Sequence, residues 1–347
     1  MLIFNESTLD DLIKVIRVHE IQVYLVIILS NKWGFSAMTV SKLRVILITM
    51  GVSNIMNSLL ETSINTVGVI ESKQRKSNVF NKELKEYCLE MGIPYYFMNE
   101  GCNAQLANWV REIEPDLIVT YKMSELLGKN ILDIPNKGSI NLHFSLLPKY
   151  RGSHPIFWTF YNYDLNPGVT VHYLDEGEDT GNIIYQESYN LPVGSTEEDL
   201  IHLSSIIGIQ LLLKSIADIE NNCEPQMCQP KKSPTERARQ IKPDEYQKIV
   251  EWENWELERT WHLLRGTQNW LNVFDFSNIK GKISKWRILQ YTKQDIKPQL
   301  TVGKVYKEAD NFYVYCGLGL IYMEILMEAE GLFLSLTLLK NIVYNLI

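Results

Sequence analysis

Apolar and polar positions follow two alternating patterns from Leu43 onward. Residues 43–51 form a short apolar run closed by Gly51, which is typical of a buried strand. Residues 53–62 have the spacing of an amphipathic helix, and residues 65–72 predict a second strand. This order of strands and helices predicts a parallel sheet that helices cover on both faces.

The same alternation continues to Tyr121. The sequence predicts an amphipathic helix over residues 81–92, a strand over 93–98, a helix over 104–114 and a strand over 116–121. One α/β domain with a Rossmann-like, mostly parallel sheet accounts for all of these elements.

A change of composition after residue 220 predicts a second, smaller domain. Residues 221–245 are rich in Pro, Asn, Lys and Gln, as in a linker that crosses a surface. Residues 245–266 predict one helix that stops at Gly266, and short strands follow over 285–291, 302–309 and 312–317. We therefore expect a catalytic domain over 43–230 and, over 231–347, a helix plus a small OB-like antiparallel β-barrel.

Residues 1–42 do not fit the alternation and predict an extension of uncertain role. We expect either that Met38 is the natural start or that the earlier segment is loosely attached. The densest apolar runs, 23–29 and 331–339, are too short to span a bilayer, and acidic residues near the start do not fit a signal peptide. A soluble, cytoplasmic protein is the expectation.

Composition and charge narrow the classes of function. With 46% hydrophobic and 22% charged residues, the chain is globular. Its net charge of −7 argues against a protein covered in phosphate-binding surface. Five cysteines without regular spacing favour free thiols in a reducing compartment, and a structural zinc at Cys223 and Cys228 is disfavoured.

Polar residues interrupt an apolar strand predicted over residues 139–144. Asn141 and His143 are two positions apart, so both side chains face the same way near the carboxyl end of a strand, where open α/β sheets build their sites. From this pair alone, a hydrogen-bonded core Asn and His remain an alternative.

A second polar segment follows over residues 168–186. A strand carrying His172 leads into an acidic loop with Asp175, Glu176, Glu178 and Asp179, which offers the His–Asp pairing that acid–base chemistry needs. A solvated turn is the preferred interpretation for the first three carboxylates. We expect His172 to pack against Asn141 and His143 as a structural histidine.

The two segments resemble a known family. Asn-x-His-x-Ser-Leu-Leu-Pro at residues 141–148, Tyr-Arg-Gly at 150–152 and Asp-Thr-Gly at 179–181 resemble the signature of formyltransferases that use N10-formyltetrahydrofolate. The likeness covers about residues 43–230. The remaining residues are similar to the C-terminal domain of methionyl-tRNA formyltransferases and of some sugar-modifying relatives.

The resemblance implies the roles of the site residues. Asn141 would stabilise an oxyanion, His143 would manage the proton of the amine, and Asp179 would assist His143. No metal and no covalent intermediate are implied. The implied co-substrate contacts are Thr120, Tyr121, Lys122, Met123, Ser124, Leu147, Pro148 and Asp175, and the implied substrate contacts are Lys149, Tyr150, Arg151 and Trp158. A structural salt bridge for Arg151 and a place in the core for Trp158 remain alternatives.

The acceptor amine is the remaining question. Phe144 looks more like the sugar enzymes, and residues 71–83 are shorter and less basic than the corresponding loop of the tRNA enzymes. We therefore expect a nucleotide-linked amino sugar, with methionyl-tRNA as the alternative and glycinamide ribonucleotide less favoured. A catalytically silent folate- or nucleotide-binding module stays open. The apolar run 331–347 needs cover, so a homodimer is possible.

Overall fold

The computed structural model describes residues 41–62, 64–73, 81–98, 103–123, 125–293, 299–309, 311–329 and 332–335. Ser124, the predicted extension up to residue 40 and most of the apolar C-terminal run lie outside these residues. The expectations about Met38 and about a homodimer therefore stay predictions.

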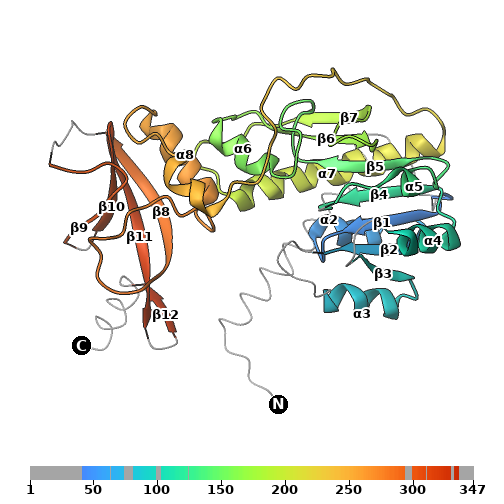
Figure 1. Ribbon diagram of the computed structural model, residues 1–347, viewed down its shortest axis with the longest axis horizontal. Coiled ribbons are helices and arrows are strands. Elements are labelled where there is room, and N and C mark those ends of the chain that lie inside the picture. The colour runs from blue at the N-terminus through green and yellow to red at the C-terminus, as the bar shows by residue number, and fades with distance from the viewer. Residues whose placement is uncertain are drawn as a thin grey trace, which may run out of the picture.

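The first domain is built on a seven-stranded sheet (Figure 1). Its order is β3-β2-β1-β4-β5-β6-β7; the pairs from β3 to β5 are parallel, and β6 and β7 are antiparallel. The strands are β1 Val45–Thr49, β2 Thr66–Ser72, β3 Tyr95–Met98, β4 Leu117–Tyr121, β5 Ser139–His143, β6 Gly168–Tyr173 and β7 Ile183–Ser188. The mostly parallel Rossmann-like sheet is confirmed.

Helices cover both faces of this sheet, which explains why β1 is apolar at every position but Thr49. Val45 and Leu47 pack with α2, α3 and α7 on one face, whereas Ile46 and Ile48 pack with α4 and α5 on the other. The helices of this domain are α2 Asn54–Leu60, α3 Lys82–Glu90, α4 Ala104–Ile113, α5 Lys129–Leu132, α6 Pro155–Tyr161 and α7 Glu197–Glu220. Four of them begin at side-chain caps, Ser53, Asn81, Asn103 and Thr196.

Helix α7 runs along the sheet (Figure 1) and is long and apolar enough to meet the length and composition criteria of a membrane-spanning helix. It packs, however, against β6, β7 and α2. Gly208 allows a close approach, because a Cβ atom there would lie 2.8 Å from Cδ2 of Leu142 in β5. These contacts are those of a core helix.

The second domain contains a five-stranded antiparallel sheet, which confirms the expected antiparallel strands; the OB-like barrel stays a prediction. Its strands are β8 Ile283–Lys293, β9 Val305–Glu308, β10 Asn311–Cys316, β11 Gly319–Ala329 and β12 Leu332–Ser335. In Figure 1 this sheet lies at the opposite end of the molecule from α3, with α6 and helix α8, Leu257–Thr267, between the two sheets.

The single helix predicted over residues 245–266 is wrong. The structure has a short 3₁₀ helix, η1 Pro243–Lys248, and a separate helix α8, Leu257–Thr267. Between them the Trp252 carbonyl accepts the N–H of Gly317 in the β10–β11 turn at 2.8 Å, so it is used outside a helix. This hydrogen bond to a turn that is distant in sequence takes the place of a helical one, although the apolar spacing of the sequence is continuous.

The segment between the domains is bound to the first domain. Ala238 donates its N–H to the Arg151 carbonyl at 2.7 Å, and its own carbonyl accepts from His154 at 2.8 Å. Ala238 and Ile241 are buried in a core that Phe160 of α6 shares with Leu263 of α8. Most of residues 221–245 are exposed or half-buried, as expected of a linker that crosses a surface, whereas Ala238 and Ile241 belong to the interior.

Candidate active site

Strand β5 carries the predicted amide and imidazole. Asn141 lies opposite Thr120 of β4 and His172 of β6. The Thr120 hydroxyl donates to Asn141 Oδ1 at 2.8 Å, and Asn141 Nδ2 lies 3.2 Å from His172 Nε2. These partners fix the orientation of the amide. One N–H of Asn141 has no acceptor among the residues that the structure describes, which leaves it for a ligand in the cavity that Asn141 lines.

His172 is fully buried and holds Asn141 in place. Its Nδ1 lies 2.8 Å from the Tyr173 carbonyl, which can only accept, so Nδ1 carries the proton and Nε2 accepts from Asn141. Burial lowers the pKa of His172 to about 4, although the nearby Asp179 carboxylate acts in the opposite direction. A neutral, orienting His172 agrees with the structural role expected for it.

The two ring nitrogens of His143 have different neighbours, Tyr150 and Asp179. Its Nε2 lies 3.0 Å from the carbonyl of Tyr150, so Nε2 donates and Nδ1 carries the lone pair of the neutral ring. The Nδ1 atom lies 3.7 Å from Asp179 Oδ2. A proton accepted at Nδ1 would therefore face a carboxylate.

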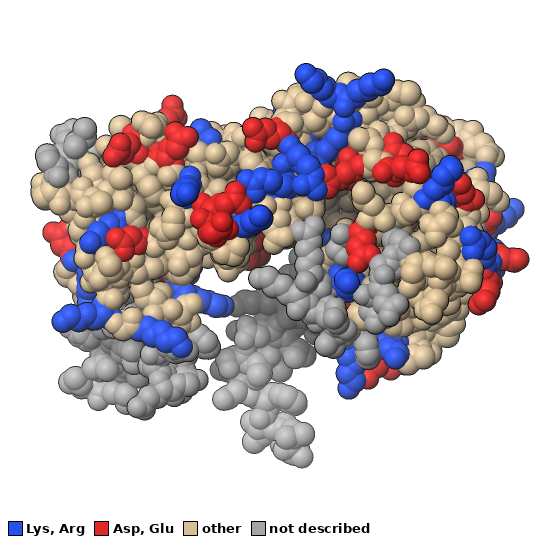
Figure 2. Space-filling view, in the orientation of Figure 1, with Lys and Arg blue, Asp and Glu red and all other residues tan. Residues whose placement is uncertain are grey.

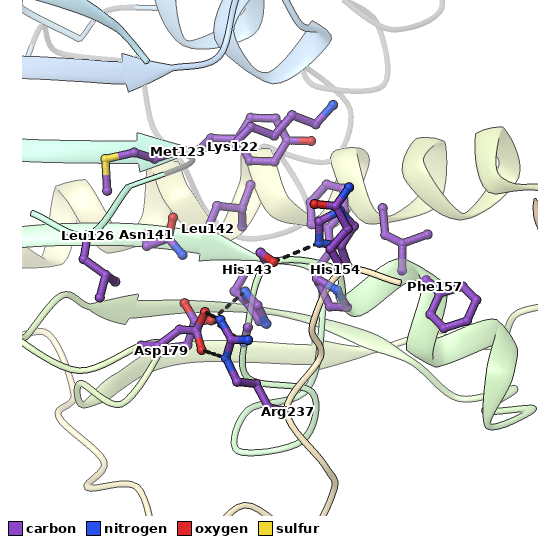
Figure 3. A pocket seen from close by; sticks show the side chains of 18 of the residues that line it. Lys122, Met123, Leu126, Asn141, Leu142, His143, His154, Phe157, Asp179 and Arg237 are labelled. Carbon is purple, nitrogen blue, oxygen red and sulfur yellow. Dashed lines mark hydrogen bonds and ion pairs between the residues drawn. The ribbon is translucent and has the colours of Figure 1, made fainter. Parts of the chain in front are cut away.

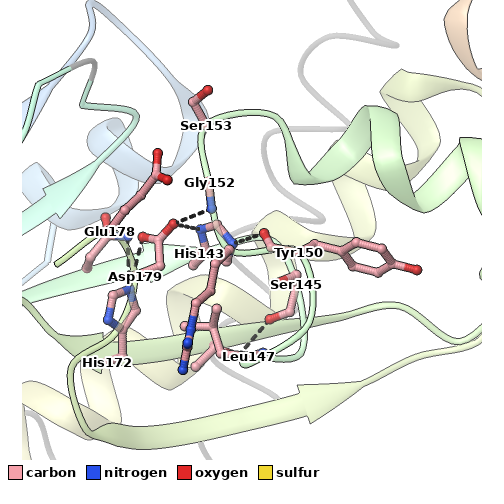
Figure 4. A network of polar contacts seen from close by, with 12 residues as sticks. His143, Ser145, Leu147, Tyr150, Gly152, Ser153, His172, Glu178 and Asp179 are labelled. Atoms are coloured by element: carbon pink, nitrogen blue, oxygen red, sulfur yellow. Dashed lines mark hydrogen bonds and ion pairs between the residues drawn. The ribbon is translucent and has the colours of Figure 1, made fainter. Parts of the chain in front are cut away.

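Asp179 reaches the two histidines from the turn between β6 and β7 (Figure 4). Oδ1 lies 3.6 Å from His172 Nε2, and Oδ2 accepts the backbone N–H of Gly152 at 2.8 Å. The backbone of Asp179 has a φ of +54°, in the left-handed region that residues with a side chain rarely adopt. The structure thus brings the three predicted residues, Asn141, His143 and Asp179, to one place.

A cavity of 670 Å³ opens in front of these groups (Figure 3). The ends of β4 and β5 and the turn at Asp179 form its floor, and residues 237–270 contribute Arg237, Tyr246 and Trp270. Both domains therefore build the walls. In the described part of the chain, no group of three His, Cys, Asp or Glu side chains is placed to hold a metal ion.

The predicted co-substrate contacts divide into two groups. Tyr121, Lys122 and Met123 line the cavity at the end of β4, and Thr120 lies behind them on Asn141. Ser124 lies outside the described residues. The remaining three are not among the lining residues: Leu147 and Pro148 belong to the loop that Thr170 and Ser233 hold, and Asp175 accepts from Thr180 and Gly177 within its own turn.

None of the predicted substrate contacts lines this cavity. Lys149 pairs with Asp164 at 3.6 Å, and the Tyr150 hydroxyl donates to the same carboxylate at 3.2 Å. The Arg151 guanidinium binds Gln229 and two backbone carbonyls, and Trp158 is buried and donates to the Arg239 carbonyl. The loop after β5 directs the side chains of residues 149–151, and α6 directs Trp158, to partners outside the cavity, so a substrate contact of these four stays a prediction.

Several lining residues were not predicted. His154 and Phe157 stand at the start of α6, Glu197 at the start of α7, and Tyr246 and Trp270 come from the second domain. Phe157 is adjacent to Trp158, which the sequence placed near the site, and the other residues gave no such signal. Burial raises the pKa of Glu197 and lowers the pKa of Lys122. The Lys122 charge opposes the shift of Glu197, and the Glu197 charge opposes the shift of Lys122.

Comparison with known proteins gives consistent matches. Residues 43–212 match the family described as formyl transferase. A methionyl-tRNA formyltransferase of Halothermothrix orenii is 30% identical over 252 residues, which cover 71% of this chain and 78% of the relative. The enzyme of the same name from Alkaliphilus oremlandii is 32% identical over 234 residues, covering 66% and 74%.

Two solved structures share the fold. WlaRD, described as a sugar 3N-formyl transferase, was crystallised in the presence of dTDP and 5-N-formyl-THF; it matches with a TM-score of 0.53 at 20% identity and covers 84% of this chain and 99% of its own. An N-formyltransferase from Helicobacter canadensis, in complex with folinic acid and dTDP-3-aminofucose, matches with a TM-score of 0.53 at 20% identity, covering 81% and 98%.

Proposed function

The chain belongs to the formyl transferase family, and on this premise we propose that it moves a formyl group from N10-formyltetrahydrofolate to the primary amine of a nucleotide-linked amino sugar. Formyl transfer follows from the family; the donor, the acceptor and the roles of the residues are the proposal. The observation that carries it is the convergence of Asn141, His143 and Asp179 on one cavity.

Asn141 stabilises the charge that develops during attack. The amine nitrogen forms a bond to the formyl carbon, and the carbonyl π electrons move to oxygen as an oxyanion. The N–H of Asn141 that is not used by His172 donates to this oxygen. Because Thr120 and His172 hold the amide in advance, no reorientation is needed when the charge appears.

His143 moves the proton. Nδ1 accepts it from the attacking nitrogen, which becomes cationic on bond formation, and returns it to the folate nitrogen as the carbon–nitrogen bond to the formyl group breaks. Nε2 keeps its proton on the Tyr150 carbonyl throughout. Asp179 stabilises the imidazolium between these steps, because its Oδ2 faces Nδ1.

The choice of a sugar acceptor is supported by the charges of the cavity and of the surface. Among the described residues, the Lys and Arg side chains that line the cavity are Lys122 and Arg237, and the carboxylates are those of Glu125, Glu178, Asp179 and Glu197. On the face shown in Figure 2, Lys and Arg side chains are interspersed with Asp and Glu. A polyanion the size of tRNA is bound mainly through its phosphates and would favour a more basic surface.

Methionyl-tRNA is the second candidate acceptor. The observation in its favour is the name shared by relatives that are 30–32% identical and match most of their own length. Tyr246 and Trp270, which line the cavity, could stack on a base of either a nucleotide sugar or a tRNA acceptor end.

Turnover tests both acceptors. The protein is incubated with N10-formyltetrahydrofolate and a panel of dTDP- and UDP-linked amino sugars or with charged initiator tRNA, and free tetrahydrofolate and formylated product are measured. We expect product with at least one sugar and none with tRNA; formylation of tRNA alone would overturn the acceptor. A His143→Ala variant should turn over about 100- to 10,000-fold more slowly while still binding the folate in calorimetry, and full activity of this variant would contradict the assigned role.

A further inference from the structure

We propose that Gln229 is a positioning residue that holds Asp179 in its reactive place, with Arg151 as its anchor. Gln229 lies in the segment between the two domains, and its hydrogen bonds within the described residues go to Arg151, Asp179 and Gly181, not to His143 or Asn141. Its amide nitrogen donates to the backbone carbonyls of Asp179 at 3.0 Å and of Gly181 at 2.6 Å. It therefore binds both ends of the turn that presents the carboxylate.

The chemistry of the neighbours fixes the orientation of the Gln229 amide. Arg151 has only donors, and its Nε and Nη2 bind Gln229 Oε1 at 3.1 Å and 2.7 Å. The two turn carbonyls have only acceptors, so they require the amide nitrogen. If the amide were flipped, its N–H groups would face the donors of Arg151 and its oxygen would face the two turn carbonyls. Only the unflipped arrangement satisfies all of these groups.

Arg151 is itself held on three sides. Besides Gln229, it donates to the carbonyls of Pro230 at 2.9 Å and Lys231 at 3.2 Å, and 8% of the residue is exposed. No ion pair of Arg151 occurs within the described ranges, and its guanidinium donates to these three oxygens. The anchor thus uses a side chain that has no contact with the cavity.

The contacts form a closed ring around Asp179. Arg151 binds Gln229, Gln229 binds the Asp179 backbone, and the Asp179 carboxylate accepts the N–H of Gly152, the residue after Arg151. Asp179 is in the left-handed backbone region, which persists only where surrounding contacts enforce it. Without Gln229 the turn can relax, and the 3.7 Å separation of Asp179 Oδ2 from His143 Nδ1 is no longer maintained.

Hydrogen exchange tests the ring without a substrate. In Gln229→Ala, we expect the amide of Gly152, whose N–H the Asp179 carboxylate accepts at 2.8 Å, to exchange at least about tenfold faster, as measured by mass spectrometry on the full chain. Gln226→Ala is the matched control, because Gln226 is exposed in the same segment and donates to Glu224 only. Unchanged exchange in Gln229→Ala, or equal acceleration in the control, would overturn the proposal.

Gln229→Glu provides a second variant if Gln229→Ala fails to fold. Its carboxylate still accepts from Arg151 but faces the two carbonyls without a proton, so Gly152 should again exchange faster after correction for the intrinsic pH effect. At lower pH the protonated carboxyl can donate to one carbonyl, and protection should partly return. If the Gly152 amide of Gln229→Glu exchanged as slowly as that of the parent at every pH, the proposed role of Gln229 would be refuted.

Turnover separates a positioning role from a general loss of stability; this part of the test rests on the proposed formyl transfer. We expect Gln229→Ala to lower kcat by about 10- to 100-fold with KM changed less than about twofold. In an Asp179→Asn background, Gln229→Ala should lower kcat little further, because Gln229 acts through Asp179. An equal loss in both backgrounds would contradict the proposal. A parent protein without turnover would defeat the proposed function, while the hydrogen-exchange result would still test whether Gln229 holds the Asp179 turn.

Discussion

Two buried histidines, His172 and His262, are held neutral by their surroundings. Burial lowers the pKa of His262 to about 4, with the Glu258 carboxylate acting against the shift. Its Nδ1 accepts the N–H of Gly194 at 2.9 Å, and its Nε2 has no hydrogen-bond partner in the described part of the structure. His262 thus links α8 to the loop before α7 through an acceptor that protonation at Nδ1 would remove.

The lowered pKa predicts a loss of stability in mild acid. The unfolded chain takes up a proton near pH 6.5 and the folded chain near pH 4, so the contribution of His262 is full above pH 6.5 and declines as the pH falls toward 4. Each such histidine contributes a slope of about 1.4 kcal/mol per pH unit in this window. His172 titrates in the same direction.

A His262→Asn variant isolates this effect, because its amide oxygen can still accept from Gly194. Between pH 7 and pH 5, the parent should lose about 2 kcal/mol more free energy of unfolding than the variant. Urea unfolding at both pH values measures the difference. Parallel pH dependence of the two proteins would show that His262 does not titrate as described.

Asn141, His143 and Asp179 could be proposed from the sequence because short stretches of chain carry them and resemble a family signature; spacing alone left a hydrogen-bonded core pair open. Asn141 and His143 share a strand face by geometry alone, and the left-handed Asp179 turn lies in a Gly-containing loop. The loop after β5 could not be predicted in the same way. Tyr150 has a φ of +56°, which changes the direction of the chain. Lys149 therefore contacts Asp164, and Arg151 contacts Gln229, rather than the cavity.

At the level of elements, α6 and α8 pack against each other where the two domains meet, next to the cavity. Sequence spacing predicted the end of α8 at Gly266 from the usual preference of glycine for helix ends. In the structure Gly266 lies within α8, Leu257–Thr267, and its missing Cβ makes room for the Phe160 ring of α6. The glycine is required by a packing contact, which no local pattern could indicate.

Gly266→Ala should therefore destabilise the protein. Alanine alone would favour the helix by about 1 kcal/mol, but its Cβ would overlap the fully buried Phe160 ring, and such overpacking costs about 1–3 kcal/mol. Gly208→Ala in α7 is the matched control, since its Cβ would meet the flexible end of Leu142. We expect a larger drop in the urea midpoint for Gly266→Ala than for the control. A more stable Gly266→Ala protein would mean that the contact with Phe160 is loose.

At the scale of the whole molecule, composition indicated two domains joined by a linker, whereas burial indicates one continuous core at the junction. Phe157, Trp158 and Phe160 of α6 pack with Leu263 and Leu264 of α8. The same core continues into the second sheet through Ile288, Phe312 and Ile321. Sequence patterns reveal which side chains are apolar, but not that two domains bury them against each other. Tyr246 and Trp270 reach the cavity for this reason.

This shared core predicts that the chain unfolds as one unit. Separation of the domains would expose the aromatic side chains of α6, and each such side chain gains about 1.5–3 kcal/mol from burial, so neither half is expected to persist alone through the transition. We expect one calorimetric peak with equal calorimetric and van't Hoff enthalpies, and tryptophan fluorescence that changes at the same temperature as far-UV circular dichroism. Phe160→Ala at the junction should lower the midpoint of both probes together. Two resolved peaks, or a fluorescence change that precedes the loss of helix signal, would show that the domains are energetically independent and that the cavity wall can open without unfolding of the sheet.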